Sequence, residues 1–194
     1  MKGITENEIL FLLTILKSPE TQYNANSISK VLGISAMGAL KIAKKLEKEN
    51  ILTSKKLGKA KFYSINYAND YAKQYIKLIL KKEAEQSTPF VKRWINELKK
   101  IKSAELIILF GSVIKKEEKA NDVDVLIITE QKKFDLLKKE IEEINLINQK
   151  KIHPLYQSSK DFKTNIQKAD TVVINAIKGI FIYGEDFFIE AVKK

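Results

Sequence analysis

The stretch LFGSVIKKEEKANDVDVLII, residues 109–128, combines two apolar runs with features that hydrophobic packing does not require. Gly111 and Ser112 follow the first run directly, and Asp122 and Asp124 open the second run. Alternate residues of a strand point to the same face, so the two carboxylates are predicted to lie side by side. Carboxylates held that close repel each other unless a cation lies between them. The stretch therefore predicts a metal site.

The glycine and the serine fit a complementary role. Gly111 has no side chain, so its backbone can approach a ligand closely. Ser112 supplies a hydroxyl and, if a helix begins there, backbone N–H groups suited to phosphate oxygens. Val123 and Val125 are expected to point away from this site and into the core. A phosphate cradle beside a carboxylate pair that holds a divalent metal is the apparatus of phosphoryl or nucleotidyl transfer.

The segments around this stretch predict a mixed α/β domain over residues 87–194. The first apolar run is nearly continuous, which indicates a strand buried on both faces. The expected elements are a helix from Pro89, strands over residues 104–110, 122–129 and 150–157, a short helix or turn between the first two strands, a helix over 132–147, a helix from about 169 that continues into an apolar stretch ending at Gly184, and a closing helix over 185–194.

The first third of the chain has a different pattern. Residues 5–17 open with the Thr-x-x-Glu spacing of a helix capping box. A short helix is expected over about 27–32, and a further helix with Ser35 as its N-cap. Two strands flank a lysine-rich turn at Gly58. Helix, helix, turn, helix and basic hairpin is the layout of a winged helix-turn-helix, predicted over residues 1–67, and the whole chain is accordingly of the α/β (α+β) class.

The segment ISKVLGISAMGALKIAKKLEKENILTSKKLGKAKFYSIN resembles the winged-helix domains of prokaryotic transcription regulators. The resemblance implies a helix in the DNA major groove and a hairpin, the wing, along the DNA backbone. The alternative is a dimerisation or protein-docking module with solvated lysines. The residues predicted to contact DNA are Ser35, Met37, Lys41, Lys44, Lys45, Lys55, Lys56, Lys59 and Lys61.

Charge supports an anionic partner for this region. The formal net charge is +11, and residues 41–61 alone hold eight lysines and two glutamates. Such lysines can neutralise phosphates and release counterions. Residues 68–86 predict an amphipathic linker helix, which either pairs with its mate in a homodimer or packs on its own hairpin.

Composition limits the other chemistry. The absence of cysteine excludes disulfides, thiolate nucleophiles and zinc fingers, and a single histidine leaves little material for an imidazole-ligated metal. A bound metal is thus expected to be a hard cation on oxygen ligands, Mg²⁺ or Mn²⁺. No apolar run approaches the roughly 18 residues of a membrane span, and the first residues lack a secretory signal, so we expect no membrane partner and a cytoplasmic protein.

Gly-Ser, nine residues and then Asp-x-Asp, with flanking strands and a GIFIYGEDF end, resembles the polymerase-β-like nucleotidyltransferases, specifically the small prokaryotic minimal nucleotidyltransferases. The resemblance covers about residues 88–190. It implies ATP or another nucleoside triphosphate as donor, Asp122 and Asp124 as catalytic ligands of Mg²⁺, and Gly111 and Ser112 at the phosphates. The basic residue that often follows the Gly-Ser is represented by Lys115 or its neighbour Lys116.

The resemblance also implies a third carboxylate on a following strand, and this sequence departs from that pattern. The strand predicted at 150–157 carries no acid; His153 or Pro154 stands in the place, and Asp161 lies beyond the strand. His153 is either a general base or a structural residue. Two functions stay open: a DNA-binding transferase, or a transcription regulator whose transferase-like domain senses nucleotide or dimerises. Some relatives modify a partner toxin, so a partner protein is a further candidate acceptor.

Overall fold

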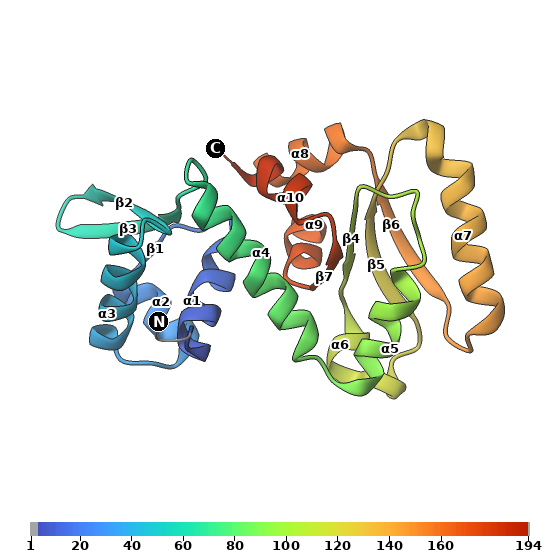
Figure 1. Cartoon of the computed structure of the whole chain (residues 1–194), viewed down its shortest axis with the longest axis horizontal. Helices are drawn as coiled ribbons and strands as arrows, with labels where there is room; N and C mark the ends of the chain where they lie inside the picture. The colour runs from blue at the N-terminus through green and yellow to red at the C-terminus, as the bar shows by residue number, and fades with distance from the viewer. Residues whose placement is uncertain (1–3, 194) are drawn as a thin grey trace. The chain divides into compact units, whose positions relative to one another are not determined.

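A computed structural model gives the structure of the chain and describes residues 4–193. The chain divides into two compact units, Met1–Ile79 and Leu80–Lys194 (Figure 1). The division falls inside helix α4 (Asp70–Glu85), which occupies most of the predicted linker segment. The domain bounds expected from the sequence stay a prediction. None of the helices in residues 4–193 combines the length and the apolar character that a bilayer crossing needs.

The N-terminal unit contains the three helices and the hairpin expected from its sequence. They are α1 (Glu6–Leu16), α2 (Ala25–Leu32), α3 (Ala36–Lys48), β2 (Leu52–Leu57) and β3 (Ala60–Ile65). A two-residue strand, β1 (Tyr23–Asn24), completes an antiparallel sheet of order β1-β3-β2. Helix α2 begins earlier than expected because Asn24 and Ser27 form a reciprocal capping box, each side chain bonding the other's backbone N–H at 2.9 Å.

The C-terminal unit is built on a four-stranded mixed sheet. Its elements in chain order are α5 (Pro89–Leu98), β4 (Leu106–Leu109), α6 (Ser112–Lys116), β5 (Val123–Ile128), α7 (Phe134–Ile147), β6 (Ile152–Gln157), α8 (Ser159–Gln167), α9 (Thr171–Ile177), β7 (Ile180–Tyr183) and α10 (Glu185–Val192). The strand order is β6-β5-β4-β7. Strand β4 is antiparallel to β5 and β7, whereas β5 and β6 are parallel.

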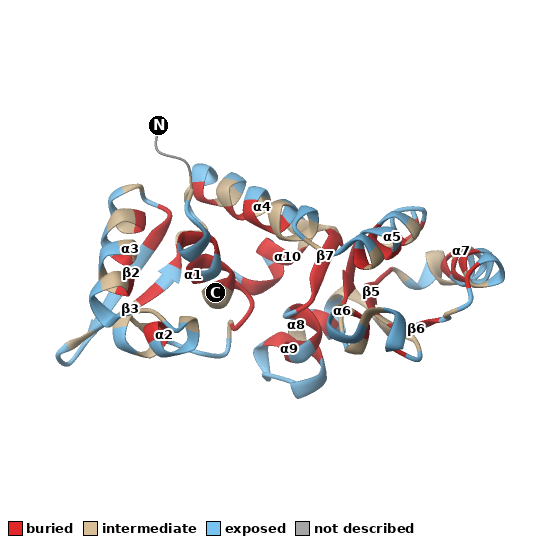
Figure 2. Ribbon diagram, turned by 90° about the horizontal axis from the view of Figure 1, so that it is seen from below, coloured by how far each residue is buried: buried red, intermediate tan, exposed pale blue. Residues whose placement is uncertain are grey.

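Helices cover both faces of this sheet, as the burial of β4 on both faces predicts (Figure 2). Val123, Val125 and Ile127 of β5 share one core cluster with residues of α5 and α7. Helices α8, α9 and α10 lie on the opposite side of the sheet from α7 (Figure 1). The valines next to the paired aspartates thus point into the core, as expected from strand alternation.

The end of the chain departs from the expected pattern. Helix α8 was not predicted, and the apolar stretch before Gly184 forms strand β7 after a separate helix, α9. Gly179 lies between α9 and β7, where a Cβ would stand only 2.2 Å from the carbonyl oxygen of Leu109. Only a residue without a side chain fits this approach, so glycine at this position allows β7 to begin beside β4 after α9 has ended at Ile177.

Candidate functional site

Three strand ends meet at one edge of the C-terminal sheet. Because β4 and β5 are antiparallel, the residues that follow β4 lie beside the start of β5. Because β5 and β6 are parallel, the starts of these two strands also lie side by side. Gly111, Asp124 and His153 are brought together by this topology. Asp122 immediately precedes β5 instead of lying within it, yet still joins the same group.

Asp122, Asp124 and His153 form a cluster of potential metal ligands. One ligand atom from each side chain lies within 4.8 Å of those from the other two. The Nδ1 atom of His153 stands 3.1 Å from Oδ1 of Asp124, its register partner on the neighbouring strand. The aspartates are half-buried and the histidine is exposed. The only histidine of the chain therefore lies at the predicted metal site, where the resemblance implies a third carboxylate.

Strand register explains why His153 arrives there. Ile152 is buried in the core cluster opposite Val123, so the next residue points to the other face, beside Asp124. A slip of one residue would exchange the buried isoleucine and the exposed histidine, which fixes the pairing. Pro154 follows within β6, and the edge position of that strand tolerates its missing N–H.

Gly111 packs directly on the carboxylate of Asp124. Its φ is +78°, a value that favours glycine, and a Cβ built on it would stand 2.1 Å from Oδ2 of Asp124. The backbone N–H of Phe110 donates to the Asp124 carbonyl at 3.0 Å, which holds the two segments together. Glycine is thus required at position 111 both by backbone conformation and by space.

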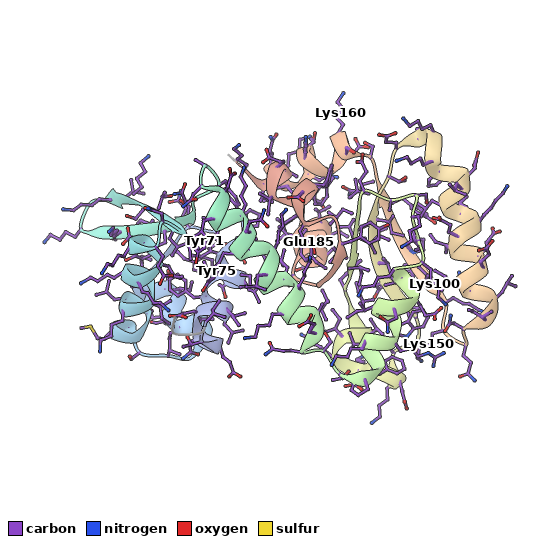
Figure 3. All side chains as sticks on the ribbon, in the orientation of Figure 1. Tyr71, Tyr75, Lys100, Lys150, Lys160 and Glu185 are labelled. Atoms are coloured by element: carbon purple, nitrogen blue, oxygen red, sulfur yellow. The ribbon has the colours of Figure 1, made fainter. Side chains whose placement is uncertain are left out.

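The remaining predicted residues lie on α6. Ser112 is the first residue of this helix and is half-buried, and Lys115 is exposed near its end. Buried Val113 anchors the helix to the core. The loop that leads to Asp122 is fixed from another direction, because the ammonium of Lys150 donates to the Ala120 carbonyl (Lys150 is labelled in Figure 3).

Asp161 lies outside this cluster. It is in the first turn of α8, where its backbone N–H and its carboxylate both bond the hydroxyl of Ser158, the cap of that helix. In the described part of the chain, the cluster of Asp122, Asp124 and His153 gains no further acid. His153 stands beside the two aspartates, where the resemblance implies a third carboxylate.

A comparison with known families matches this half of the chain. Residues 92–184 match the family model described as Polymerase beta, Nucleotidyltransferase. The match supports a nucleotidyltransferase-type domain in this segment, in agreement with the resemblance predicted from the Gly-Ser and Asp-x-Asp motif. Domains of this family use divalent metal ions and nucleoside triphosphates. A search of curated proteins finds no match for the chain.

The residues present fit a divalent cation. Two carboxylates and one imidazole provide anionic oxygen and neutral nitrogen donors, and all three converge within a few ångströms. Because Gly111 has no side chain, it does not cover the Asp124 carboxylate on the side where a Cβ would stand. The cluster therefore offers donors suited to a divalent cation, with an imidazole where the resemblance implies a third carboxylate.

The lysines predicted to contact DNA lie in the N-terminal unit and fall into two groups. Five have no ion-pair partner in the part of the chain that the structure describes, and all five are exposed: Lys41, Lys44, Lys55, Lys56 and Lys59. Lys45 pairs with the buried carboxylate of Glu8 at 2.6 Å, and Lys61 pairs with Glu47 at 2.8 Å. The charge of the second group is already partly neutralised within the protein.

Two further residues of the predicted surface lie at the N-terminal end of α3. Met37 is 62% exposed near the start of the helix. Ser35 is the N-cap, and its hydroxyl accepts the Gly38 N–H at 3.0 Å. The side chain of Ser35 therefore has a structural task that a base contact would have to share or replace.

The pairing of Lys45 shifts the pKa values of both partners. The hydrogen bond to Glu8 raises the pKa of the Lys45 ammonium. Burial acts to raise the pKa of the Glu8 carboxyl, but the hydrogen bonds from Lys45 and from the Thr5 N–H outweigh it and leave the pKa below its ordinary value. Glu8 thus holds two roles, because it also closes the capping box of α1.

Proposed function

We propose that the C-terminal domain transfers a nucleotidyl group from ATP or another nucleoside triphosphate to an acceptor. The observation that supports this most strongly is the contact of Gly111 with the Asp124 carboxylate inside a segment that matches the nucleotidyltransferase family. An ordinary sheet edge with surface aspartates has no need of a glycine at positive φ packed on one of them.

Each residue has a task in the proposed reaction. Asp122 and Asp124 hold Mg²⁺ or Mn²⁺, which supplies charge neutralisation at the phosphates when bound. Gly111 and Ser112 receive the phosphates, and Lys115 contributes positive charge nearby. An acceptor oxygen forms a bond to the α-phosphorus, the bond from that phosphorus to the bridging oxygen breaks, and pyrophosphate leaves. The acceptor's proton passes to a base.

We propose that the N-terminal unit is a winged helix-turn-helix that binds DNA. The order of its helices and hairpin supports this, as do the five exposed lysines without ion-pair partners on α3, β2 and the turn after it. Such lysines exchange counterions for phosphates. A homodimer remains a prediction, supported by exposed Tyr71 and Leu78 on α4 (Tyr71 and Tyr75 are labelled in Figure 3).

A second function is favoured by one specific observation. His153 stands at the ligand position where the family pattern has a carboxylate, which weakens the case for a base of the usual kind. In this alternative the chain is a transcription regulator whose C-terminal domain binds nucleotide without turnover. DNA affinity would then change on addition of nucleotide while no group is transferred.

The fate of a labelled phosphate in ATP distinguishes the transferase from the regulator. Incubation with Mg²⁺ or Mn²⁺ and ATP labelled at the α-phosphate, with candidate acceptors that include a partner protein, should yield labelled acceptor and pyrophosphate. ATP labelled at the γ-phosphate should leave the acceptor unlabelled. Asp122→Asn and Asp124→Asn should each reduce transfer on the order of 100-fold or more. Transfer at the wild-type rate in both variants would contradict the proposal, and tight nucleotide binding without pyrophosphate release would favour the regulator.

A further inference from the structure

The imidazole at the metal site has a consequence for the choice of metal. Mg²⁺ prefers oxygen ligands in octahedral geometry, whereas imidazole nitrogen suits first-row transition metals. The cluster here offers two carboxylates and one imidazole. From this donor set we infer that the site selects a first-row transition-metal ion over Mg²⁺ and that His153 is the residue responsible, an inference that rests on the metal site of the function proposed above and not on turnover.

The geometry of the contact agrees with shared ligation of one ion. Two neighbouring ligands at about 2.1 Å from an ion, at right angles to each other, stand about 3.0 Å apart. The Nδ1 of His153 and Oδ1 of Asp124 are separated by 3.1 Å. The same distance also suits a hydrogen bond from the imidazole to the carboxylate. An experiment can distinguish this hydrogen bond from shared ligation of one metal ion.

The fold fixes the backbone of His153 beside Asp124, although the side chain itself is exposed. Its backbone lies in β6, paired in register with Asp124, and buried Ile152 precedes it in the core. The side chain is 73% exposed, so no neighbouring packing depends on its shape. Replacement of His153 should therefore change the donor set while the fold stays intact.

The composition of the chain makes this ligand easy to identify. The protein has one histidine and no cysteine, so in an untagged chain an imidazole coupled to a bound metal ion can come only from His153. Mn²⁺ is a suitable probe because electron paramagnetic resonance measures both free Mn²⁺ and the coupling of bound Mn²⁺ to ¹⁴N of a ligand.

The experiment uses the untagged full-length protein, His153→Asn and His153→Asp. Mn²⁺ is titrated into each protein, and bound Mn²⁺ is then displaced with Mg²⁺, which gives the ratio of the two dissociation constants. Wild type should show ¹⁴N coupling and a preference for Mn²⁺ at least tenfold above that of His153→Asp. His153→Asp, with oxygen donors alone, should bind Mg²⁺ more tightly than wild type, and His153→Asn should lose the ¹⁴N coupling.

Absence of ¹⁴N coupling in wild type, or the same Mn²⁺ to Mg²⁺ ratio in wild type and His153→Asp, would overturn the inference and leave His153 as a hydrogen-bond donor to Asp124. These readouts do not require turnover. Transfer of label with an unchanged metal ratio would refute the metal preference alone. Normal metal selection without pyrophosphate release would refute the transferase and leave the metal preference standing.

Discussion

The two units of this protein place their candidate functional residues in opposite ways. In the C-terminal unit, Gly111, Asp124 and His153 are fixed against one another by strand register and by contacts of a few ångströms. In the N-terminal unit, five exposed lysines have no ion-pair partner among residues 4–193, and their common property is charge. Activity at the first kind of site should be lost on small changes of side-chain shape. DNA affinity at the second should change gradually with the number of lysines.

Among the changes that test this comparison of the two units, the largest effect is expected from Gly111→Ala. The new Cβ would stand 2.1 Å from Oδ2 of Asp124 at a backbone φ of +78°, so the carboxylate must move. We expect transfer to fall on the order of 100-fold, with a stability loss of about 1–3 kcal/mol. Initial rates with α-labelled ATP and thermal unfolding measure the two effects.

Gly58→Ala is the matched control for this change. Gly58 also has a positive φ, +58°, but nothing lies within 4 Å of a Cβ built there. The control should lose about 1 kcal/mol of stability from backbone strain and keep its transfer rate. Equal transfer rates in the two variants would show that shape at the C-terminal site is not critical.

The next effect distinguishes the paired lysine from its exposed neighbour. Lys45→Ala leaves the buried Glu8 carboxylate without its ammonium partner and should destabilise the N-terminal unit by about 1–3 kcal/mol. Lys44→Ala, on the same helix but exposed, should change stability by less than about 0.5 kcal/mol. Hydrogen exchange of α1 peptides measures the N-terminal unit.

Trp94 provides an internal reference for these variants. It is the only tryptophan of the chain and is buried in the C-terminal core. Unfolding followed by Trp94 fluorescence should be unaffected by Lys45→Ala. If Lys44→Ala and Lys45→Ala destabilise α1 equally, the division of the lysines into paired and unpaired groups is wrong.

DNA binding also tests the division of the lysines into ion-paired and unpaired groups, and we expect smaller changes in free energy there. Individual replacement of Lys44, Lys55, Lys56 or Lys59 by Ala should reduce the slope of log affinity against log salt by up to about one unit each. Lys45→Ala should leave the slope unchanged once the folded fraction is taken into account. Fluorescence anisotropy of a labelled duplex at several KCl concentrations gives the slopes, and a shallow wild-type slope that no replacement alters would contradict DNA binding through these lysines.

The smallest effect concerns pH. The pKa of Glu8 lies below its ordinary value of 4.5 in the folded protein, so its pairing stabilises the fold above that value and is lost as pH falls through the folded pKa. The N-terminal unit should therefore lose stability in acid, and Glu8→Gln should lose less between pH 6 and pH 3 than wild type does. Urea unfolding across this range measures the difference; parallel curves would exclude Glu8 as a source of the acid sensitivity.

The sequence predicted much of the site because its signals are local. Gly111, Ser112, Asp122 and Asp124 stand within one short stretch, and alternation in a strand is enough to pair the aspartates. The neighbourhood of His153 depends on which strand lies beside β5 and in which register, and neither follows from local pattern. The sequence shows no acid on that strand and leaves His153 or Pro154 open in its place; the strand register decides for His153.

Local sequence patterns also do not predict other features that depend on contacts between distant residues. Strand β7 could not be distinguished from the preceding helix because both segments are apolar. Glycine at position 179 is required by the backbone of Leu109, which is distant in sequence. The ion pair of Lys45 was missed because Glu8, its partner on α1, already had an explanation as a capping residue. Contacts between distant residues decide these features.

A crystal of the full chain soaked with Mn²⁺ and an ATP analogue that cannot be cleaved between the α- and β-phosphates tests the central claim most directly. The anomalous signal of Mn²⁺ should lie between the carboxylates of Asp122 and Asp124, with phosphate density beside Gly111 and Ser112. Nucleotide or metal bound elsewhere, with the two aspartates in contact with neither, would contradict the assignment of this site.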